Sequence, residues 1–345
     1  MSEKINIFYE GVNDLAGILA TSIASLCSNT KSELDIYILD TGLCEFYKKQ
    51  LLLLQDRFSH ATIKFVPVDL TMFDGLKGYR AENFVDCYSR LLIPDLVNDI
   101  DKAIYLDSDT VVLKDISLLW NIDMDGKALA APPDTGIFEA LFPHMRKVGI
   151  EPNQVFISAG IFVIDCKLWR NESISVRLLK LAREKKDVIE IIVEDLFTIY
   201  FRNNFKILDP SWGFIENSDY VANLIPIESI TPEYLRKIKN DLGVIHFAGI
   251  NKVWKTEKHW LTKKTILHFN EFWLYAKMTP FYAGLNKSFV SNLILDSTSS
   301  AVEKSSSFVC RIKLFNRIPF IKIRKRKTGT RYYLFNFIPL FKVTD

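Results

Sequence analysis

Apolar and polar residues follow two periods along the first 280 residues of the chain. Short apolar runs predict buried strands, and apolar residues spaced three or four apart predict helices between them. The predicted strands are residues 5–9, 34–39, 62–67, 103–106, 128–131, 158–164 and 243–249, and the predicted helices are 15–26, 45–58, 84–92, 174–183, 194–201 and 263–277. This alternation is typical of an α/β fold whose mostly parallel sheet is covered on both faces.

The strand at 103–106 runs directly into Asp107 and Asp109. Open α/β sheets bind ligands at the carboxyl ends of their strands, which is where these two residues are expected. Residues two apart in an extended segment share a face, and Ser108 between them faces the other way. By itself such a pair is most simply a solvated acidic turn after a strand. Two carboxylates so placed repel each other unless a cation lies between them, so the alternative is a bound Mg²⁺ or Mn²⁺.

Composition narrows the class of protein. With 345 residues, 48% of them hydrophobic, the chain can bury a large core, which excludes disorder for most of it. The five cysteines are odd in number and lack C-x-x-C spacing, so neither a disulfide framework nor a zinc site is expected. No window reaches the about 20 apolar residues of a membrane span. We expect a cytoplasmic protein with reduced thiols, because no apolar leader precedes the first strand.

The last 35 positions differ from the rest. They hold ten of the 44 basic residues and one acid, so the body carries −6 and the tail +9. Serine-rich stretches at 297–300 and 305–307 predict a linker before the tail. We therefore expect a catalytic domain at 1–280, a linker at 281–310 and a basic, aromatic tail at 311–345.

The tail contains a short repeat. L-F-N-R-I-P-F-I-K-I at 314–323 returns as L-F-N-F-I-P-L-F-K-V at 334–343, and the basic run 324–327 lies between the two copies. Each copy is too short for a domain, and its proline prevents a continuous helix. The tail is either a hairpin packed on the body or a set of aromatic wedges and basic residues on an anionic membrane, and we favour the membrane.

Two motifs together point to a known family. Y-L-D-S-D ends at Asp109, and H-F-A-G-I-N-K-V-W runs from His246 to Trp254. In this order and spacing they resemble glycosyltransferase family 8, which includes glycogenin and the lipopolysaccharide α-galactosyltransferases. The resemblance covers residues 5–277. It implies a GT-A type, single Rossmann-like domain in which Asp107, Asp109 and His246 hold Mn²⁺ or Mg²⁺.

The resemblance also implies a set of donor contacts. The donor would be a UDP-sugar, and Lys252 would reach its diphosphate. Ser158 stands where asparagine is usual and Val253 where proline is usual. Asp134 and Glu194 fall near the reacting sugar and are the candidate catalytic residues. The expected donor-binding residues are Asn13, Arg90, Asp107, Ser108, Asp109, Ser158, Gly160, Gly249 and Lys252.

The chain departs from the family pattern at two further places. Residues 10–14 read E-G-V-N-D, without the aspartate and tyrosine that often bind uracil and ribose. Val193 replaces a sugar-binding aspartate and Glu194 a glutamine. The base and the donor sugar therefore stay open. The expected role of the metal depends on neither the base nor the sugar, because a divalent metal and Lys252 can neutralise the diphosphate leaving group of any such donor.

We expect a retaining hexosyltransferase that moves glucose or galactose from a UDP-sugar to a cell-surface glycan, such as lipopolysaccharide or capsule, at the inner face of the cell membrane. Nucleic acid is not expected as a partner. One alternative is a haloacid-dehalogenase-type phosphatase, because residues 107–112 also fit its D-x-D-x-[TV]-[LV] motif, in which the first aspartate is phosphorylated. That class usually has the motif on its first strand. The other alternative is a degenerate family member without activity.

Overall fold

The structure is a computed structural model that describes residues 4–78, 84–136, 141–215, 224–248, 252–255 and 268–299, and residues 309–314, 318–326, 329–334 and 338–343 of the tail. The chain divides into two compact units, which are described separately. The first unit is Met1–Ile250 with Tyr275–Phe281, and the second is Asn251–Leu274 with Tyr282–Asp345.

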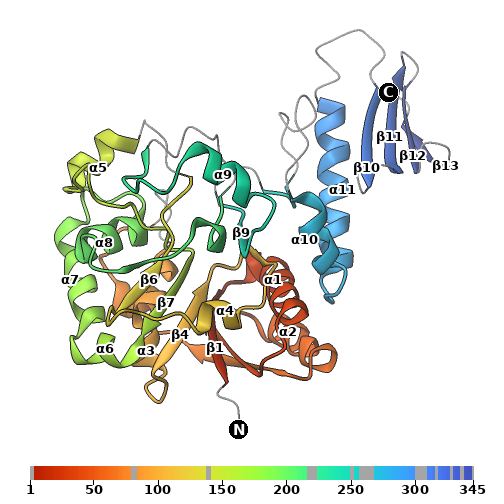
Figure 1. Ribbon diagram of the computed structural model, residues 1–345. Helices are drawn as coiled ribbons and strands as arrows, with labels where there is room; N and C mark the ends of the chain where they lie inside the picture. The colour runs from red at the N-terminus through yellow and green to blue at the C-terminus, as the bar shows by residue number, and fades with distance from the viewer. Residues whose placement is uncertain are drawn as a thin grey trace. The chain divides into compact units, whose positions relative to one another are not determined.

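The first unit is built on a seven-stranded sheet with the order β3-β2-β1-β4-β7-β6-β8 (Figure 1). Its strands are β1 (Ile5–Gly11), β2 (Leu34–Asp40), β3 (Ala61–Pro67), β4 (Lys102–Leu106), β6 (Leu129–Ala131), β7 (Ile161–Asp165) and β8 (Lys206–Ile207). Pairing is parallel except where β7 meets β4 and β6. A second, two-stranded sheet joins β5 (Thr110–Val112) to β9 (Val244–His246). The expected mostly parallel sheet is confirmed.

Helices cover both faces of this sheet. One apolar cluster joins Ile7 and Tyr9 of β1 to α1 (Ala16–Asn29) and α2 (Glu45–Arg57). Phe8, between them in β1, belongs to a second cluster with α6 (Cys166–Asn171), α7 (Ile174–Lys185) and α8 (Ile192–Phe201). Successive residues of β1 thus belong to opposite clusters, as expected for a strand that is buried on both faces of the sheet.

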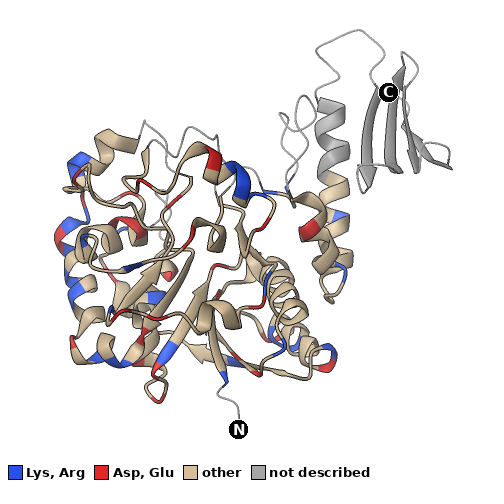
Figure 2. Ribbon diagram, viewed as in Figure 1, with Lys and Arg blue, Asp and Glu red and all other residues tan. Residues whose placement is uncertain are grey.

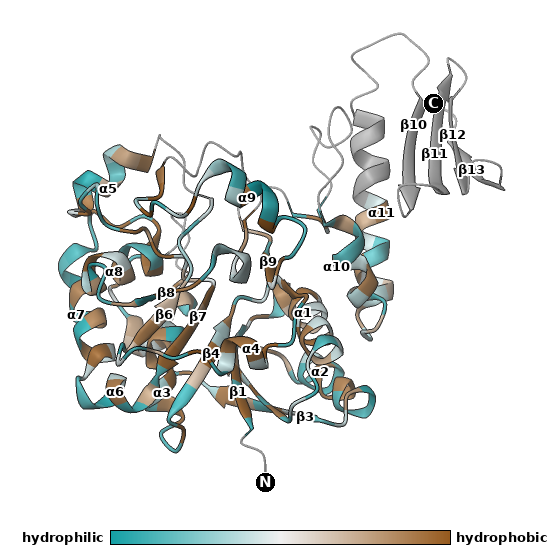
Figure 3. Cartoon of the chain, in the orientation of Figure 1, coloured by the Kyte–Doolittle hydropathy of each residue, from teal (hydrophilic) through white to brown (hydrophobic). Residues whose placement is uncertain are grey.

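Short helical segments complete the first unit. They are η1 (Asn13–Leu15), η2 (Leu70–Phe73), η3 (Asp86–Leu92), α3 (Ile93–Leu96), α4 (Ser117–Trp120), α5 (Phe142–Val148), η5 (Pro210–Trp212) and α9 (Pro232–Ile238). Figure 3 shows the central strands as largely hydrophobic, and Figure 2 shows the charged residues mostly on the outer helices and loops. No helix among the described residues is long and apolar enough to cross a membrane.

Two predicted elements differ from the structure. The helix expected at 84–92 is a 3-10 helix, η3, which leads into α3 with Pro94 in the first turn. Pro94 has no N–H to donate to the carbonyl of Arg90, so one continuous α-helix cannot pass this point. The strand expected at 158–164 begins only at Ile161. The three residues before it belong to the candidate site described below.

The second unit contains an aromatic cluster. Trp273, from α10 (Phe269–Ala276), packs with its ring centroid 5.3 Å from that of Phe289, in α11 (Tyr282–Ser299). Its indole N–H donates to the Val253 carbonyl at 3.3 Å, and Trp254 packs on Phe272. Helix α11 therefore occupies 282–299, which the serine content alone predicted to be linker. The beginning of the helix expected at 263–277 lies outside the described residues.

The tail forms a four-stranded antiparallel sheet in which each repeat is one hairpin. Its strands are β10 (Val309–Leu314), β11 (Ile318–Arg326), β12 (Gly329–Leu334) and β13 (Ile338–Val343). In the first hairpin Leu314 pairs with Ile318, and in the second Leu334 pairs with Ile338. The register shifts at the same place in both, one residue before these leucines. The sequence repeat is thus a structural repeat.

Trp169 is one of the largest fully buried side chains. Its ring packs on Phe197 and Phe201, and its N–H donates to the Ser175 hydroxyl at 3.0 Å. We expect Trp169→Phe to lower the free energy of unfolding by about 2 kcal/mol, because it leaves a cavity and an unpaired hydroxyl. Urea unfolding measures this, with the exposed Leu118→Ala as control. Equal midpoints for the two variants would contradict the prediction.

Candidate functional site

Three segments that are distant in sequence meet at the carboxyl end of β4. The Asp107 N–H donates to the Gly160 carbonyl at 2.7 Å, which fixes the segment before β7 against the end of β4. After the turn at 107–109, β5 pairs antiparallel with β9 so that Thr110 lies opposite His246. The Phe247 N–H donates to the Asp109 carbonyl at 3.0 Å. Backbone pairing thus brings two aspartates and one histidine together.

Asp107, Asp109 and His246 form a candidate metal-binding cluster. The His246 Nε2 atom lies 3.1 Å from an Asp109 oxygen and 3.4 Å from an Asp107 oxygen. One ligand atom from each residue lies within 4.8 Å of the others, the only such group of three among the described residues. Two carboxylates and an imidazole suit Mn²⁺ or Mg²⁺. The geometry therefore fits the donor set that the sequence predicts.

The protonation of this cluster depends on its burial and its charges. Burial lowers the pKa of His246, but Asp109 and Asp107 outweigh it and raise that pKa to about 10. Burial would raise the pKa of Asp107, whereas Arg90 and His246 bring it below its usual value. Both carboxylates are thus matched by positive charge on His246 and Arg90. A divalent cation would release the histidine proton on binding.

Gly160 forms one wall of the cluster. A Cβ atom at this position would lie 2.2 Å from His246 Cε1 and 2.8 Å from an Asp107 oxygen. Neither neighbour is the end of a flexible side chain, because both are held by the contacts just described. A glycine is therefore required here for close approach rather than for backbone freedom.

Arg90 positions Asp107. Its guanidinium lies 2.9 Å from Asp107 Oδ1 and donates to the Ala159 carbonyl at 3.0 Å. The Tyr105 hydroxyl donates to the same Asp107 oxygen at 2.8 Å, and the guanidinium lies over the Tyr105 ring. With Oδ1 held in this way, Oδ2 faces His246. In the structure Arg90 thus contacts protein groups, and its predicted contact with a donor stays a prediction.

Glu10 is a site residue that the sequence analysis did not select. It lies near the end of β1, next to β4 in the sheet, and accepts from Arg90 at 3.1 Å. Burial raises the pKa of Glu10 to about 8 although Arg90 opposes this. Arg90 is shared with Asp107, which retains its charge. Adjacent parallel strands end at one edge of a sheet, so the place of Glu10, directly after the predicted strand at 5–9, could have identified it as a site residue.

Glu194 and Asp134 lie within electrostatic range of the cluster. Removal from water raises the pKa of Glu194 to about 8; Arg90 lowers it, and Asp107 and Asp134 raise it. Burial also raises the pKa of Asp134, while the Gly136 N–H and His246 oppose the shift. Two carboxyl groups near the cluster therefore favour their neutral forms. Such perturbed acids are typical of functional sites.

The first turn of α8 is held by Asp195, the neighbour of Glu194. Its buried carboxylate accepts from the backbone N–H groups of Glu190 and Ile191 at 2.9 and 3.1 Å. His144 of α5 lies 2.8 Å from it. Asp195 thus fixes the start of α8, and with it the position of Glu194.

The remaining predicted residues have other surroundings. The Ser108 hydroxyl donates to the Glu10 carbonyl at 2.7 Å. Buried Ser158 donates through its N–H to the Pro132 carbonyl. Exposed Asn13 accepts from the Cys44 N–H at 2.9 Å. Lys252 lies in the second unit with its ammonium over Trp254, and Gly249 lies outside the described residues.

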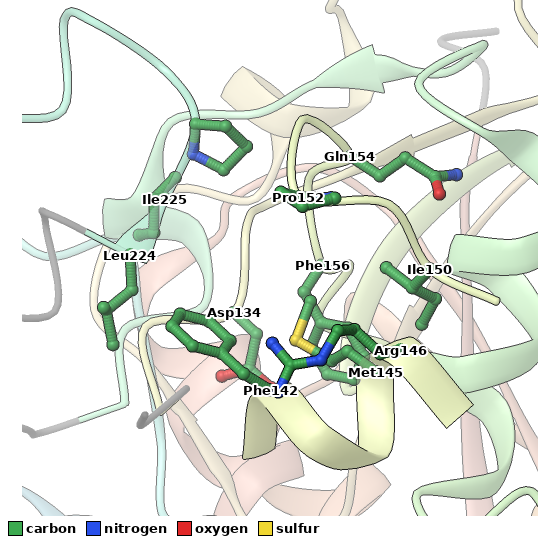
Figure 4. A pocket seen from close by; sticks show the side chains of 11 residues that line it. Asp134, Phe142, Met145, Arg146, Ile150, Pro152, Gln154, Phe156, Leu224 and Ile225 are labelled. Carbon is green, nitrogen blue, oxygen red and sulfur yellow. The ribbon is translucent and has the colours of Figure 1, made fainter. Parts of the chain in front are cut away.

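A cavity of about 230 Å³ includes Asp134 in its lining (Figure 4). Phe142, Met145 and Arg146 of α5 line one side, and Leu224 and Ile225 line another. The walls are mainly apolar, and the guanidinium of Arg146 is the cation among the residues that line it. Asp134 links this cavity to the metal-binding cluster, because the charge of His246 acts on the pKa of Asp134.

Comparison with known proteins agrees with these observations. A Haemophilus influenzae relative, provisionally named a glycosyltransferase, is 25% identical over 329 residues, covering 94% of this chain and 88% of its own length. The structure is similar to that of the bifunctional glycosyltransferase WbbM (TM-score 0.69, 20% identity, 84% of this chain), although the chain spans about half of WbbM, 52%.

The galactosyltransferase LgtC has been solved in two relevant forms. An active-site mutant with glutamate in place of glutamine has a TM-score of 0.67 at 22% identity, and a complex with donor and acceptor sugar analogs has 0.66 at 21%. Each comparison covers 80% of this chain and 96% of LgtC. At these identities the likeness establishes the fold, which is the GT-A fold expected from the sequence.

The sequence itself decides the family. The family description "Glycosyl transferase family 8" matches residues 6–258, a range that includes all three residues of the metal-binding cluster as well as Glu194. The match extends over well over half of the chain and favours a transferase over the phosphatase alternative. The chain belongs to glycosyl transferase family 8.

Proposed function

We propose that the protein is a metal-dependent, retaining hexosyltransferase that uses a UDP-sugar, with glucose or galactose as the transferred sugar. The observation that carries this proposal is the metal-binding cluster of Asp107, Asp109 and His246. The raised pKa values of Asp134 and Glu194, which favour the neutral forms of these acids, support it. The family membership supports the reaction class.

The proposed roles follow from the contacts. Asp107, Asp109 and His246 would hold Mn²⁺ or Mg²⁺, which as a Lewis acid would neutralise the departing diphosphate. Arg90 and Tyr105 hold Asp107 in the orientation that this requires. Lys252 would add positive charge at the same oxygens. Asn13, Ser108, Ser158, Gly160 and Gly249 remain proposed donor-binding residues.

We propose that Glu194 acts in its neutral form. A covalent mechanism needs an ionised carboxylate as nucleophile, whereas the pKa of Glu194 is raised to about 8 by removal from water. A neutral Glu194 instead favours front-face retention, in which the leaving diphosphate assists the attacking hydroxyl. LgtC offers a parallel, since an active-site glutamine-to-glutamate mutant of it has been solved.

For the acceptor we propose a cell-surface glycan such as lipopolysaccharide or capsule, entering through the cavity beside Asp134. Apolar walls formed by Phe142 and Phe156 suit the faces of sugar rings, and the LgtC complex holds donor and acceptor analogs together. The excess positive charge of residues 311–345 supports peripheral association with the inner face of an anionic membrane.

The metal proposal predicts that Asp109→Asn lowers Mn²⁺ binding and UDP-sugar turnover by about 100-fold or more, because one of two carboxylate ligands loses its charge. Turnover is measured over a panel of nucleotide sugars, with EDTA as a second means of removing the metal. Exposed Asp99→Asn is the control for the same chemical change. Turnover that does not depend on a metal would contradict the assignment of this metal site. A wild-type protein that binds Mn²⁺ but turns over no donor would instead indicate a degenerate family member.

The glycine wall gives a second test. Gly160→Ala places a Cβ atom where His246 and Asp107 now lie, so we expect Mn²⁺ affinity to fall by about tenfold or more. Electron paramagnetic resonance of Mn²⁺ measures this without a substrate. Substitution of Gly126 by alanine is the control; a Cβ there has open space, and its cost is backbone strain. If Gly160→Ala binds Mn²⁺ as tightly as the wild type, the cluster is not the metal site.

Glu194 predicts a pH dependence. A carboxyl group whose pKa is about 8 is neutral below that pH and ionised above it, so wild-type turnover should fall above about pH 8. Glu194→Gln stays neutral, and we expect it to keep turnover within about tenfold and to lose this fall. Glu190→Gln, two residues before the same helix, should retain the wild-type profile. A loss of about 1,000-fold at every pH would instead make Glu194 a nucleophile.

A further inference from the structure

Helix α5 presents one side to the cavity beside Asp134. Met145 and Arg146 follow Phe142 by three and four residues, so the three lie on the same side of the helix. All three line the cavity, and Figure 4 shows them on the wall that α5 forms. An acceptor sugar whose reacting hydroxyl lies near Asp134 would therefore have α5 along one side.

A buried contact fixes the orientation of this short helix. His144, between the lining residues in sequence, is buried, and its Nε2 atom lies 3.0 and 2.8 Å from the two oxygens of Asp195, in the first turn of α8. Val148, one turn later in α5, is fully buried as well. Because α5 cannot rotate about its axis without breaking the contact with Asp195, Arg146 is kept on the cavity side.

Arg146 brings a positive charge to this cavity. It is exposed and makes no ion pair in the part of the chain that the structure describes. Lys147, the next residue, does not line the cavity, and its ammonium lies 3.8 Å from a Glu190 oxygen. Asp134 supplies the one carboxyl group among the described lining residues, and burial raises its pKa, which favours the neutral form. A ligand anion would thus meet a cation here and little opposing negative charge.

We infer that the cavity selects an acceptor glycan whose sugar unit carries an acid group, a carboxylate or a phosphate, and that Arg146 binds this group. The inference rests on the proposed function and names the class of acceptor for it. A guanidinium offers parallel N–H groups that match carboxylate and phosphate oxygens, and such charge-assisted bonds are about twice as strong as neutral ones.

The remaining walls suit a sugar ring. Phe142 and Phe156 offer aromatic surface to its faces. The volume of about 230 Å³ is below the about 300–1,000 Å³ of clefts that hold drug-sized ligands, so one sugar unit fits better than a long segment. A neutral sugar in the same place would displace water from the Arg146 guanidinium without replacing all of its hydrogen bonds, which costs affinity.

The test uses the full-length protein and pairs of ligands that differ in the acid group. Two pairs are the methyl glycosides of glucuronic acid and glucose, and of galacturonic acid and galactose; mannose 6-phosphate and mannose form the phosphate pair. Affinity is measured by NMR titration with Mg²⁺ and UDP present, so that it does not depend on turnover. We expect the acidic member of at least one pair to bind about tenfold or more tightly than its neutral partner.

Substitutions on α5 assign this preference to one side chain. Arg146→Gln should abolish the preference for the acidic ligand, whereas Arg146→Lys should keep part of it because the charge remains. Lys147→Gln is the matched control, since it removes a neighbouring cation that lies outside the cavity and near Glu190. It should bind both members of each pair as the wild type does.

Other results would contradict the inference. If the wild type binds both members of every pair alike, or binds none of these ligands, the cavity does not select an acid group. If Lys147→Gln loses the preference as fully as Arg146→Gln does, the general charge of α5 attracts the anion. Hydrolysis of the UDP-sugar without acceptor is assayed in parallel. Donor hydrolysis without a preference for acidic ligands overturns the inference alone, whereas that preference without donor turnover overturns the proposed function alone.

Discussion

The site depends on the repulsion between two carboxylates that the backbone holds together. Asp107 and Asp109 are fixed at the end of β4 by main-chain bonds to Gly160 and Phe247, so they cannot move apart. Neighbouring side chains offset this repulsion. Arg90 and Tyr105 hold one oxygen of Asp107, and His246 faces the other. The architecture of the sheet thus concentrates negative charge where a cation is needed.

Charge balance at this edge extends beyond the cluster. Arg90 lies between Glu10 and Asp107, and only one of the two keeps its full charge. Glu194 is also subject to Arg90, and the pKa values of both glutamates are raised to about 8. A donor diphosphate would enter a region in which several acids are already neutral. The unfavourable field that a row of ionised carboxylates would impose on a phosphate is thereby reduced.

The sequence could predict what depends on local spacing. Asp107 and Asp109 directly follow the apolar strand residues 103–106, and His246 ends the strand at 244–246, so the three residues could be selected from the sequence. The extended backbone expected at 107–109 is instead a turn. Glu10 was missed because its role depends on strand order, which places β1 beside β4. Tyr105 was missed because an apolar run gives no sign that its hydroxyl donates to Asp107. The end of η3 depends on Pro94, and the late start of β7 depends on the contact between Gly160 and Asp107. Serine content suggested a linker at 281–310, but the packing of Phe289 on Trp273 accompanies a helix there.

The twin hairpins of the tail have the same register at each leucine and the same displaced pair before it. A sheet assembled from equivalent hairpins has a natural unit of growth, as in other repeat proteins. Gain or loss of one unit of about 20 residues would keep every remaining pair in register and would change the number of basic residues in fixed steps. The net charge of the tail could then be adjusted in evolution by copy number, without any alteration of the first unit.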